Sequence, residues 1–290
     1  MHDPYKDNPS TYWVQDRSNK EEMARLHTQD QMVTAGMGGV LPEQSDPTRF
    51  QSILDVGCGT GNWLIEAART YPSMSRLVGV DISERMIKYA REQAKTQRMD
   101  ERVEFHVMDA LSKLEFPDAS FDLVNHRLGM GYLRTWDWPN LLQQYRRVCR
   151  PEGTIRITEC NVHESNSQAV NRLTDLFTHA LSQSGHLLIE GDSNSVINGL
   201  AGLLRQHAGI RDVQTRAYKL EYRPGPPQWQ SFYEDSKLLF RTFVPFIRKW
   251  SHLPDDYEIL YQQALSEMQR SDFLATWSLL TAWGRISHGG

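Results

Sequence analysis

Three glycines at alternate positions mark the stretch of this sequence whose residue types best suit ligand binding. Residues 53–61 read ILDVGCGTG, an apolar strand that runs into Gly57, Gly59 and Gly61, and a helix-like segment follows over 62–68. Glycine lets the backbone turn tightly and removes the Cβ atom that would keep a ligand away, and the N–H groups that open the helix then face the ligand. We expect a ligand-binding loop here, although a plain turn between strand and helix would use the same glycines.

Two acidic residues indicate which ligand this loop holds. The dinucleotide motif GxGxxG needs a third glycine where this chain has Asn62, and no Gly-Lys-Ser/Thr follows as in a P-loop. Asp81 ends an apolar strand, where its carboxylate can accept both hydroxyls of a ribose. Asp109 follows the next strand and can accept from an adenine amino group. Because ligands of doubly wound sheets bind at the carboxyl ends of parallel strands, the pattern predicts an adenosine-type ligand.

Five motifs together resemble the successive motifs of class I S-adenosylmethionine-dependent methyltransferases. They occur in the right order over residues 50–160 and lie at 53–61, 78–81, 108–110, 121–124 and 150–153. The alternation of strands and helices predicts an α/β fold with a parallel sheet. The resemblance implies a doubly wound, Rossmann-like, seven-stranded sheet. Its last two strands would form an antiparallel hairpin, supplied by 213–222 and 277–286.

The resemblance also implies the cofactor, S-adenosyl-L-methionine, and the residues that contact it. Gly57 and Gly59 would line its methionine part, and Asp81 would bind the ribose. The remaining implied positions are Ile82 and Met86 on either side of the adenine, Asp109 and Ala110 at its edge, Asn125 beside the methionine amine, and Asp55, which supports the loop or reaches the amine through water.

The N-terminal residues 1–45 resemble the leading segment of small-molecule methyltransferases of secondary metabolism, where it folds over the cofactor as a lid. Tyr12 would then be a lid contact. The alternative is that Tyr12 and Trp13 only dock this segment on the core. The predicted domain plan is a single methyltransferase domain over 1–290, with a cofactor-binding core at 50–160 and helical cap insertions at 162–208 and 226–270.

Methyl transfer from a sulfonium needs orientation above all, and a base only when the acceptor must lose a proton. Candidates for that base lie after the fourth and fifth strands and are His126 and Glu159, although either could be structural. Arg127 and Tyr132 are further candidates for the substrate pocket. The 226–270 segment is rich in aromatic residues, which could be plain core or could cover an apolar, medium-sized organic acceptor.

Composition and charge disfavour several classes of partner for this protein. The 290 residues carry a net charge of −4, which disfavours a nucleic-acid partner, and three scattered cysteines favour a reducing compartment. The chain has neither a CxxC nor an HExxH motif and no long apolar stretch, so we expect no metal, no membrane partner and a soluble, cytoplasmic protein. The expected activity is transfer of a methyl group to O, N or C of a small-molecule acceptor. The alternative is a protein that binds the cofactor for another reaction or for regulation; the oligomeric state stays open.

Overall fold

The computed structural model describes residues 20–286 and is built on one mixed sheet. The strand order is β3-β2-β1-β4-β5-β8, with β7 and the short β6 both paired to β8. Strands β1 to β5 are parallel, and β8 runs antiparallel to its neighbours. The strands are β1 Ser52–Val56, β2 Arg76–Asp81, β3 Val103–Val107, β4 Phe121–Arg127, β5 Cys149–Cys160, β6 Glu164–Ser165, β7 Gln214–Tyr222 and β8 Ala275–Arg285. The predicted Rossmann-like sheet of seven strands with its antiparallel hairpin is confirmed, and the two-residue β6 is an addition to it.

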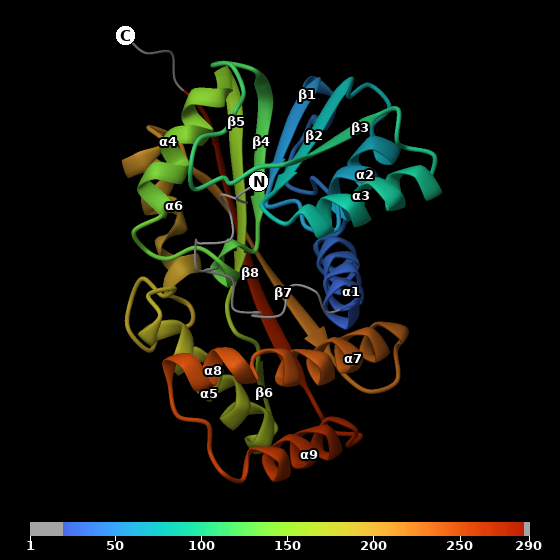
Figure 1. Cartoon of the computed structure of the whole chain (residues 1–290), viewed down its shortest axis with the longest axis vertical. Coiled ribbons are helices and arrows are strands. Elements are labelled where there is room, and N and C mark those ends of the chain that lie inside the picture. Colours follow the sequence, from blue (N-terminus) through green and yellow to red (C-terminus); the bar gives the residue numbers. More distant parts are fainter. Residues whose placement is uncertain (1–19, 287–290) are drawn as a thin grey trace, which may run out of the picture.

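Helices cover both faces of the sheet and close one end of it (Figure 1). In this view α4 and α6 lie on one side of the strands and α2 and α3 on the other, while α5, α7, α8 and α9 gather beyond one end. The helices are α1 Lys20–Met37, α2 Asn62–Thr70, α3 Glu84–Thr96, α4 Trp138–Val148, α5 Gln168–Gln183, α6 Ser195–His207, α7 Pro227–Thr242, α8 Val244–Trp250 and α9 Tyr257–Met268. The segment 162–208 is thus divided, because α5 packs on α8 and α9 whereas α6 packs on α4, β5 and β8.

Local sequence explains how the helices that follow β1 and β2 begin. The Ser83 side chain accepts a hydrogen bond from the Met86 N–H, so it is the N-cap of α3, as its residue type predicts. Helix α2 starts after Gly61, whose left-handed φ of 75° suits glycine. An added Cβ there would stand 2.7 Å from the Phe105 ring, so close packing also requires this glycine.

Strand β5 begins earlier than its sequence suggests. Residues 150–153 read RPEG, which is typical of a turn before a strand, but the strand already begins at Cys149 and its register against β4 shifts between Phe121 and Leu123. The extra pairing joins Cys149 to Phe121. Glu152 has a left-handed φ of 62°, so the backbone of β5 turns sharply within the strand rather than before it.

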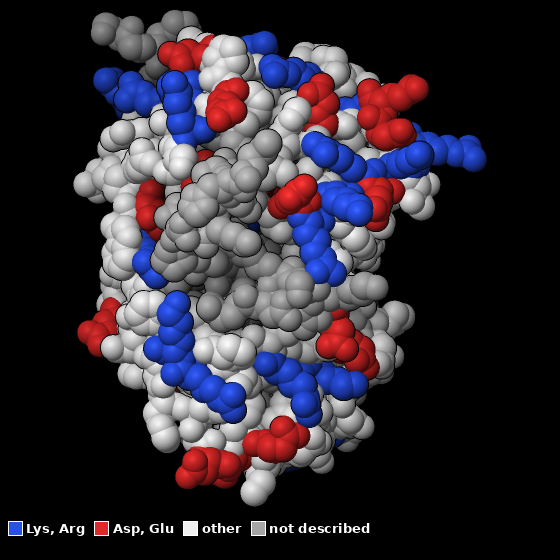
Figure 2. Space-filling view, viewed as in Figure 1, with Lys and Arg blue, Asp and Glu red and all other residues white. Residues whose placement is uncertain are grey.

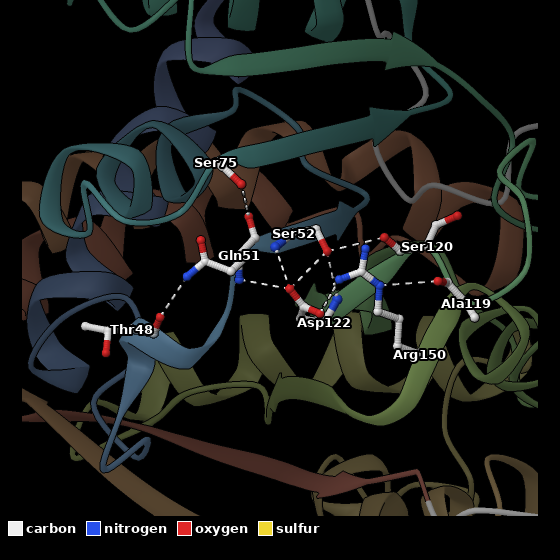
Figure 3. A network of polar contacts seen from close by, with 8 residues as sticks. All are labelled: Thr48, Gln51, Ser52, Ser75, Ala119, Ser120, Asp122 and Arg150. Carbon is white, nitrogen blue, oxygen red and sulfur yellow. Dashed lines mark hydrogen bonds and ion pairs between the residues drawn. The ribbon is translucent and has the colours of Figure 1, made fainter.

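Asp122 fixes the start of β1 against the start of β4, at the amino ends of these strands (Figure 3). Its Oδ2 accepts from the backbone N–H groups of Gln51 and Ser52, at 2.9 and 2.8 Å, and its Oδ1 accepts from Arg150 at 2.6 Å. Burial raises the pKa of Asp122, but the backbone N–H groups and Arg150 outweigh it and hold the pKa below its ordinary value. This network anchors β1 at the end of the strand opposite to its glycine loop.

Among the helices of residues 20–286, none combines the length and the apolar character that crossing a membrane requires.

Candidate cofactor and acceptor site

A cavity of about 640 Å³ lies between the carboxyl ends of the strands and the helical cap. Its wall on the sheet side comes from the loops after β1, β2 and β3 and from the segments after β4 and β5. Its wall on the cap side comes from α1, α5 and α7. It is therefore placed where doubly wound sheets bind their ligands. The predicted site residues that line it are Asp55, Gly57, Gly59, Asp81, Ile82, Met86, Asp109, Ala110, Arg127 and Tyr132. Tyr12 lies outside the described residues.

Asp81 ties the glycine loop to the end of β2. Its Oδ2 accepts from the Gly59 N–H at 3.0 Å, and its Oδ1 accepts from the Ser83 N–H at 2.8 Å. Gly57 and Gly59 both have left-handed φ values, 68° and 52°. Gly59 lines the cavity, and a Cβ added to it would meet nothing within 4 Å, so the loop leaves open space at this position. That opening beside a fixed carboxylate fits a bound nucleoside.

A second carboxylate lies after β3. Asp109 accepts from the Leu111 N–H at 2.9 Å through Oδ1 and from the Ser112 hydroxyl at 3.0 Å through Oδ2. Ile82 and Met86 contribute apolar surface to the same cavity. Apolar walls with a few fixed acceptors at the rim suit an adenine ring.

A buried chain of polar contacts holds Asp55 in place. Asn125 donates to Asp55 Oδ1 at 2.7 Å and accepts from Arg156 at 2.7 Å, and Arg156 in turn pairs with Glu43 at 2.8 Å. Burial raises the pKa of Asp55 to about 7. Asn125 itself is fully buried and is not part of the cavity wall. Its contact with the site therefore passes through Asp55.

The two candidate bases lie behind the cavity wall, with Tyr132 in front of them. His126 is fully buried, and its two ring nitrogens contact the hydroxyls of Tyr145 at 2.7 Å and Tyr132 at 3.2 Å. Glu159 accepts from the backbone N–H groups of Gly129 and Met130, at 2.8 and 3.1 Å. Neither residue belongs to the wall, whereas Tyr132 does.

Burial keeps both of these groups neutral at pH 7. It lowers the pKa of His126 to about 3 and raises the pKa of Glu159 to about 8, in spite of the two N–H groups that Glu159 accepts. The 3.8 Å approach of Glu159 Oε1 to His126 Nε2 is then a contact between neutral groups rather than an ion pair.

Arg127 lies at the junction of α1 and the sheet. It forms an ion pair with Asp30 and donates to the Thr34 hydroxyl at 3.0 Å, both on α1. Its guanidinium also lies over the Trp63 ring, 5.7 Å from the centroid. Through these contacts Arg127 holds α1 beside the glycine loop.

Several cavity residues were not predicted from the sequence. Arg25 on α1 is buried between Glu22, which its Nε and Nη2 both contact at 2.8 Å, and Asp235 of α7, which its Nη1 contacts at 2.9 Å. His163 follows β5 and lies against Phe232 of α7. In the sequence these residues sit in amphipathic or irregular segments, and the spacing of Glu22 and Arg25, three apart on one helix, is the one local signal that could have paired them.

Comparison with known proteins relates part of this chain to methyltransferases. Residues 53–153 match the family described as "Methyltransferase domain". A 27-O-demethylrifamycin SV methyltransferase of Amycolatopsis mediterranei is 31% identical over 137 residues, 47% of this chain and 47% of that protein. A demethylmenaquinone methyltransferase of Lactococcus lactis is 33% identical over 104 residues, 36% of this chain and 40% of that protein. The chain thus spans about half the length, or less, of these curated relatives.

Among solved structures, a phosphoethanolamine N-methyltransferase 2 of Haemonchus contortus in complex with phosphomonomethylethanolamine and S-adenosylhomocysteine shares the fold. Its TM-score is 0.56 at 17% identity, over 96% of this chain and 60% of that one. The match over residues 53–153 and the order of the strands lead to one assignment. Residues 53–153 therefore form a methyltransferase domain, and the strand order around them is that of the class I, S-adenosylmethionine-dependent methyltransferase fold.

Proposed function

We propose that this protein transfers the methyl group of S-adenosylmethionine to a small organic acceptor. The observation that carries the proposal is the continuity of the cavity. One space of about 640 Å³ joins the glycine loop and its two carboxylates to an end lined by phenylalanines of the cap. That volume lies within the range of pockets that bind small molecules.

The cofactor end uses residues on the strand termini. Asp81, which holds the N–H groups of Gly59 and Ser83 at the cavity wall, binds the ribose hydroxyls, and Asp109 accepts from the adenine edge. Asp55, held by Asn125, faces the methionine amine. When bound, the cofactor supplies an activated methyl group, so the protein has chiefly to orient the acceptor.

Tyr132 stands between the two ends. Its hydroxyl lies against Gly57, because a Cβ added there would be 2.3 Å from the Tyr132 oxygen. His126 contacts that hydroxyl from behind, at 3.2 Å, and its ring stacks on the Tyr132 ring with centroids 5.8 Å apart. In this proposal His126 and Glu159 act through Tyr132 and the backbone at Gly129, as positioning residues rather than as groups that touch the acceptor.

The acceptor end favours a largely apolar molecule. Phe177, Phe232, Phe240, Phe243 and Trp277 line it. The charged groups nearby, Glu22, Arg25 and Asp235, bind one another. On the face of the molecule drawn in Figure 2, basic and acidic side chains are interspersed, unlike the continuous basic stripe that nucleic-acid binding requires.

Two measurements test the proposal. Mass spectrometry of molecules that co-purify with the protein would identify a retained cofactor or acceptor. Quantification of S-adenosylhomocysteine formed with a panel of apolar hydroxyl, amine and activated-carbon acceptors then measures turnover. We expect acceptor-dependent formation. A protein that binds the cofactor and yields no S-adenosylhomocysteine with any acceptor would instead favour a different reaction or a regulatory role.

A further inference from the structure

His163 lines the acceptor end of the cavity and carries a buried polar atom without a partner in the described part of the chain. The residue follows β5, lines the cavity and is 7% exposed. Its Nε2 is buried and has no hydrogen-bond partner among residues 20–286. Burying such an atom without a partner costs free energy, so an unpaired nitrogen in a residue that lines the cavity suits a ligand that supplies the missing hydrogen bond.

The surroundings of His163 are aromatic. The Phe232 ring meets it edge-on, with centroids 5.4 Å apart, and the Phe240 ring lies tilted at 6.1 Å. Burial lowers the pKa of His163 to about 4, so the imidazole is neutral at pH 7. A neutral ring between phenyl groups favours an uncharged partner over an ionic one.

Two other polar groups on this wall, Arg25 and Asn161, have partners within the described part of the chain. Arg25 bridges Glu22 and Asp235, and Asn161 bonds both to Asn194 and to the N–H of Ser278. Arg134 Nε is also buried without a partner in the described part of the chain, but its guanidinium lies over the rings of Trp136 and Trp250. His163 is therefore the polar group that lies among the phenylalanines of the acceptor end.

We propose that His163 Nε2 hydrogen-bonds a hydroxyl group of the acceptor, and that the acceptor class is an apolar ring system carrying a hydroxyl. A hydroxyl both donates and accepts, so it satisfies Nε2 in either tautomer of the neutral imidazole. The rings of Phe232 and Phe240 supply the apolar contact for the rest of the molecule. This inference rests on the proposed function, because it names the substrate class of the same cavity.

Binding of two matched probes tests the inference without turnover. The probes are 2-naphthol and naphthalene, titrated by fluorescence in the presence of saturating S-adenosylhomocysteine. We expect the wild type to prefer 2-naphthol by about tenfold, the value of one hydrogen bond to a buried group. His163→Leu should remove this preference and leave naphthalene binding unchanged or tighter. His163→Gln, which keeps a hydrogen-bonding group, should retain part of it.

His186 provides a matched control, because it is also a buried histidine beside a phenylalanine but pairs with Ser184 and is not part of the cavity wall. His186→Gln should keep the preference for 2-naphthol. The inference is overturned if the preference persists in His163→Leu, or if wild type with S-adenosylhomocysteine bound shows no preference or binds neither probe. Failure of the proposed function would appear differently, as loss of cofactor binding or of turnover with the His163-dependent preference intact.

Discussion

The guanidinium of Arg25 in α1 lies 2.9 Å from the carboxylate of Asp235 in α7, and both side chains are buried. The same guanidinium is held on its other edge by Glu22, one turn earlier in α1. The pair joins the N-terminal helix to the cap at the cavity wall. An ion pair in this position couples the packing of α1 to that of the acceptor end.

Replacing Arg25 should therefore destabilise the protein strongly. Arg25→Met leaves the Glu22 and Asp235 carboxylates buried without their cation, and breaking a buried pair in this way costs about 3–5 kcal/mol. Urea unfolding measures the loss. Arg241→Met is the matched control, because Arg241 of α7 pairs with Glu258 on the exposed surface, and it should cost about 1 kcal/mol or less. Equal losses in the two variants would contradict the structural role of the buried pair.

Alanine variants of Gly59 and Gly57 allow the cost of backbone strain to be measured apart from the cost of a steric contact. Both adopt left-handed φ values, so alanine at either position should cost about 1–2 kcal/mol in strain. Alanine at Gly57 also meets the Tyr132 hydroxyl at 2.3 Å, which should add about 1–3 kcal/mol. Tyr132→Phe in the Gly57→Ala background should recover part of that addition. Thermal and urea unfolding of the three variants check the order.

Gly59→Ala has a second expected effect. Gly59 lines the cavity and its added methyl group would meet no protein atom within 4 Å, so we expect the methyl group to occupy space that the ligand needs and S-adenosylmethionine affinity to fall by about tenfold or more, beyond the cost in stability. Calorimetry on the folded variant measures this. Undiminished affinity would mean that the ligand does not approach the loop at Gly59.

The sequence predicted the position of site residues well where that position depends only on one strand and the residues that directly follow it. Asp81 and Asp109 each follow an apolar strand, and parallel strands end at one edge of a sheet, so their convergence on one cavity could be predicted. The Ser83 N-cap was an equally local signal, whereas the antiparallel hairpin was expected only from the resemblance to a known family. In contrast, the contact of Arg25 with Asp235 joins residues 210 positions apart, and no periodicity in either helix encodes it.

The environment of the candidate base His126 could not be predicted either, although it depends on neighbouring residues in the sequence. His126 directly follows Asn125 at the predicted strand end, yet β4 continues to Arg127 and buries the His126 side chain. A residue near the end of a strand is buried in the sheet only if the strand extends past it. Sequence patterns do not define that end to within one or two residues. Tyr132, one 3₁₀ turn later, therefore fills the wall position instead.

Glu159 should make stability depend on pH. Its folded pKa of about 8 lies above its ordinary value, so between about pH 4.5 and 8 the folded state holds a proton that the unfolded state releases. The free energy of unfolding then falls as pH rises, by up to about 1.4 kcal/mol per pH unit from this group. Glu159→Gln removes the titration, so the wild type should lose stability relative to the variant between pH 5 and 8. A difference in unfolding free energy that does not change with pH would contradict the buried, protonated carboxyl.

Calorimetric titration of S-adenosylmethionine into wild type, Asp81→Ala and Asp122→Ala tests the central claim most directly. Asp122 is the control because it also accepts two backbone N–H groups, but at the far ends of the strands. We expect one-to-one binding in wild type, a loss of about ten- to a hundredfold in Asp81→Ala from the missing ribose contacts, and wild-type affinity in Asp122→Ala. Unchanged affinity in Asp81→Ala, or an equal loss in both variants, would contradict the assignment of the glycine loop and Asp81 as the cofactor site.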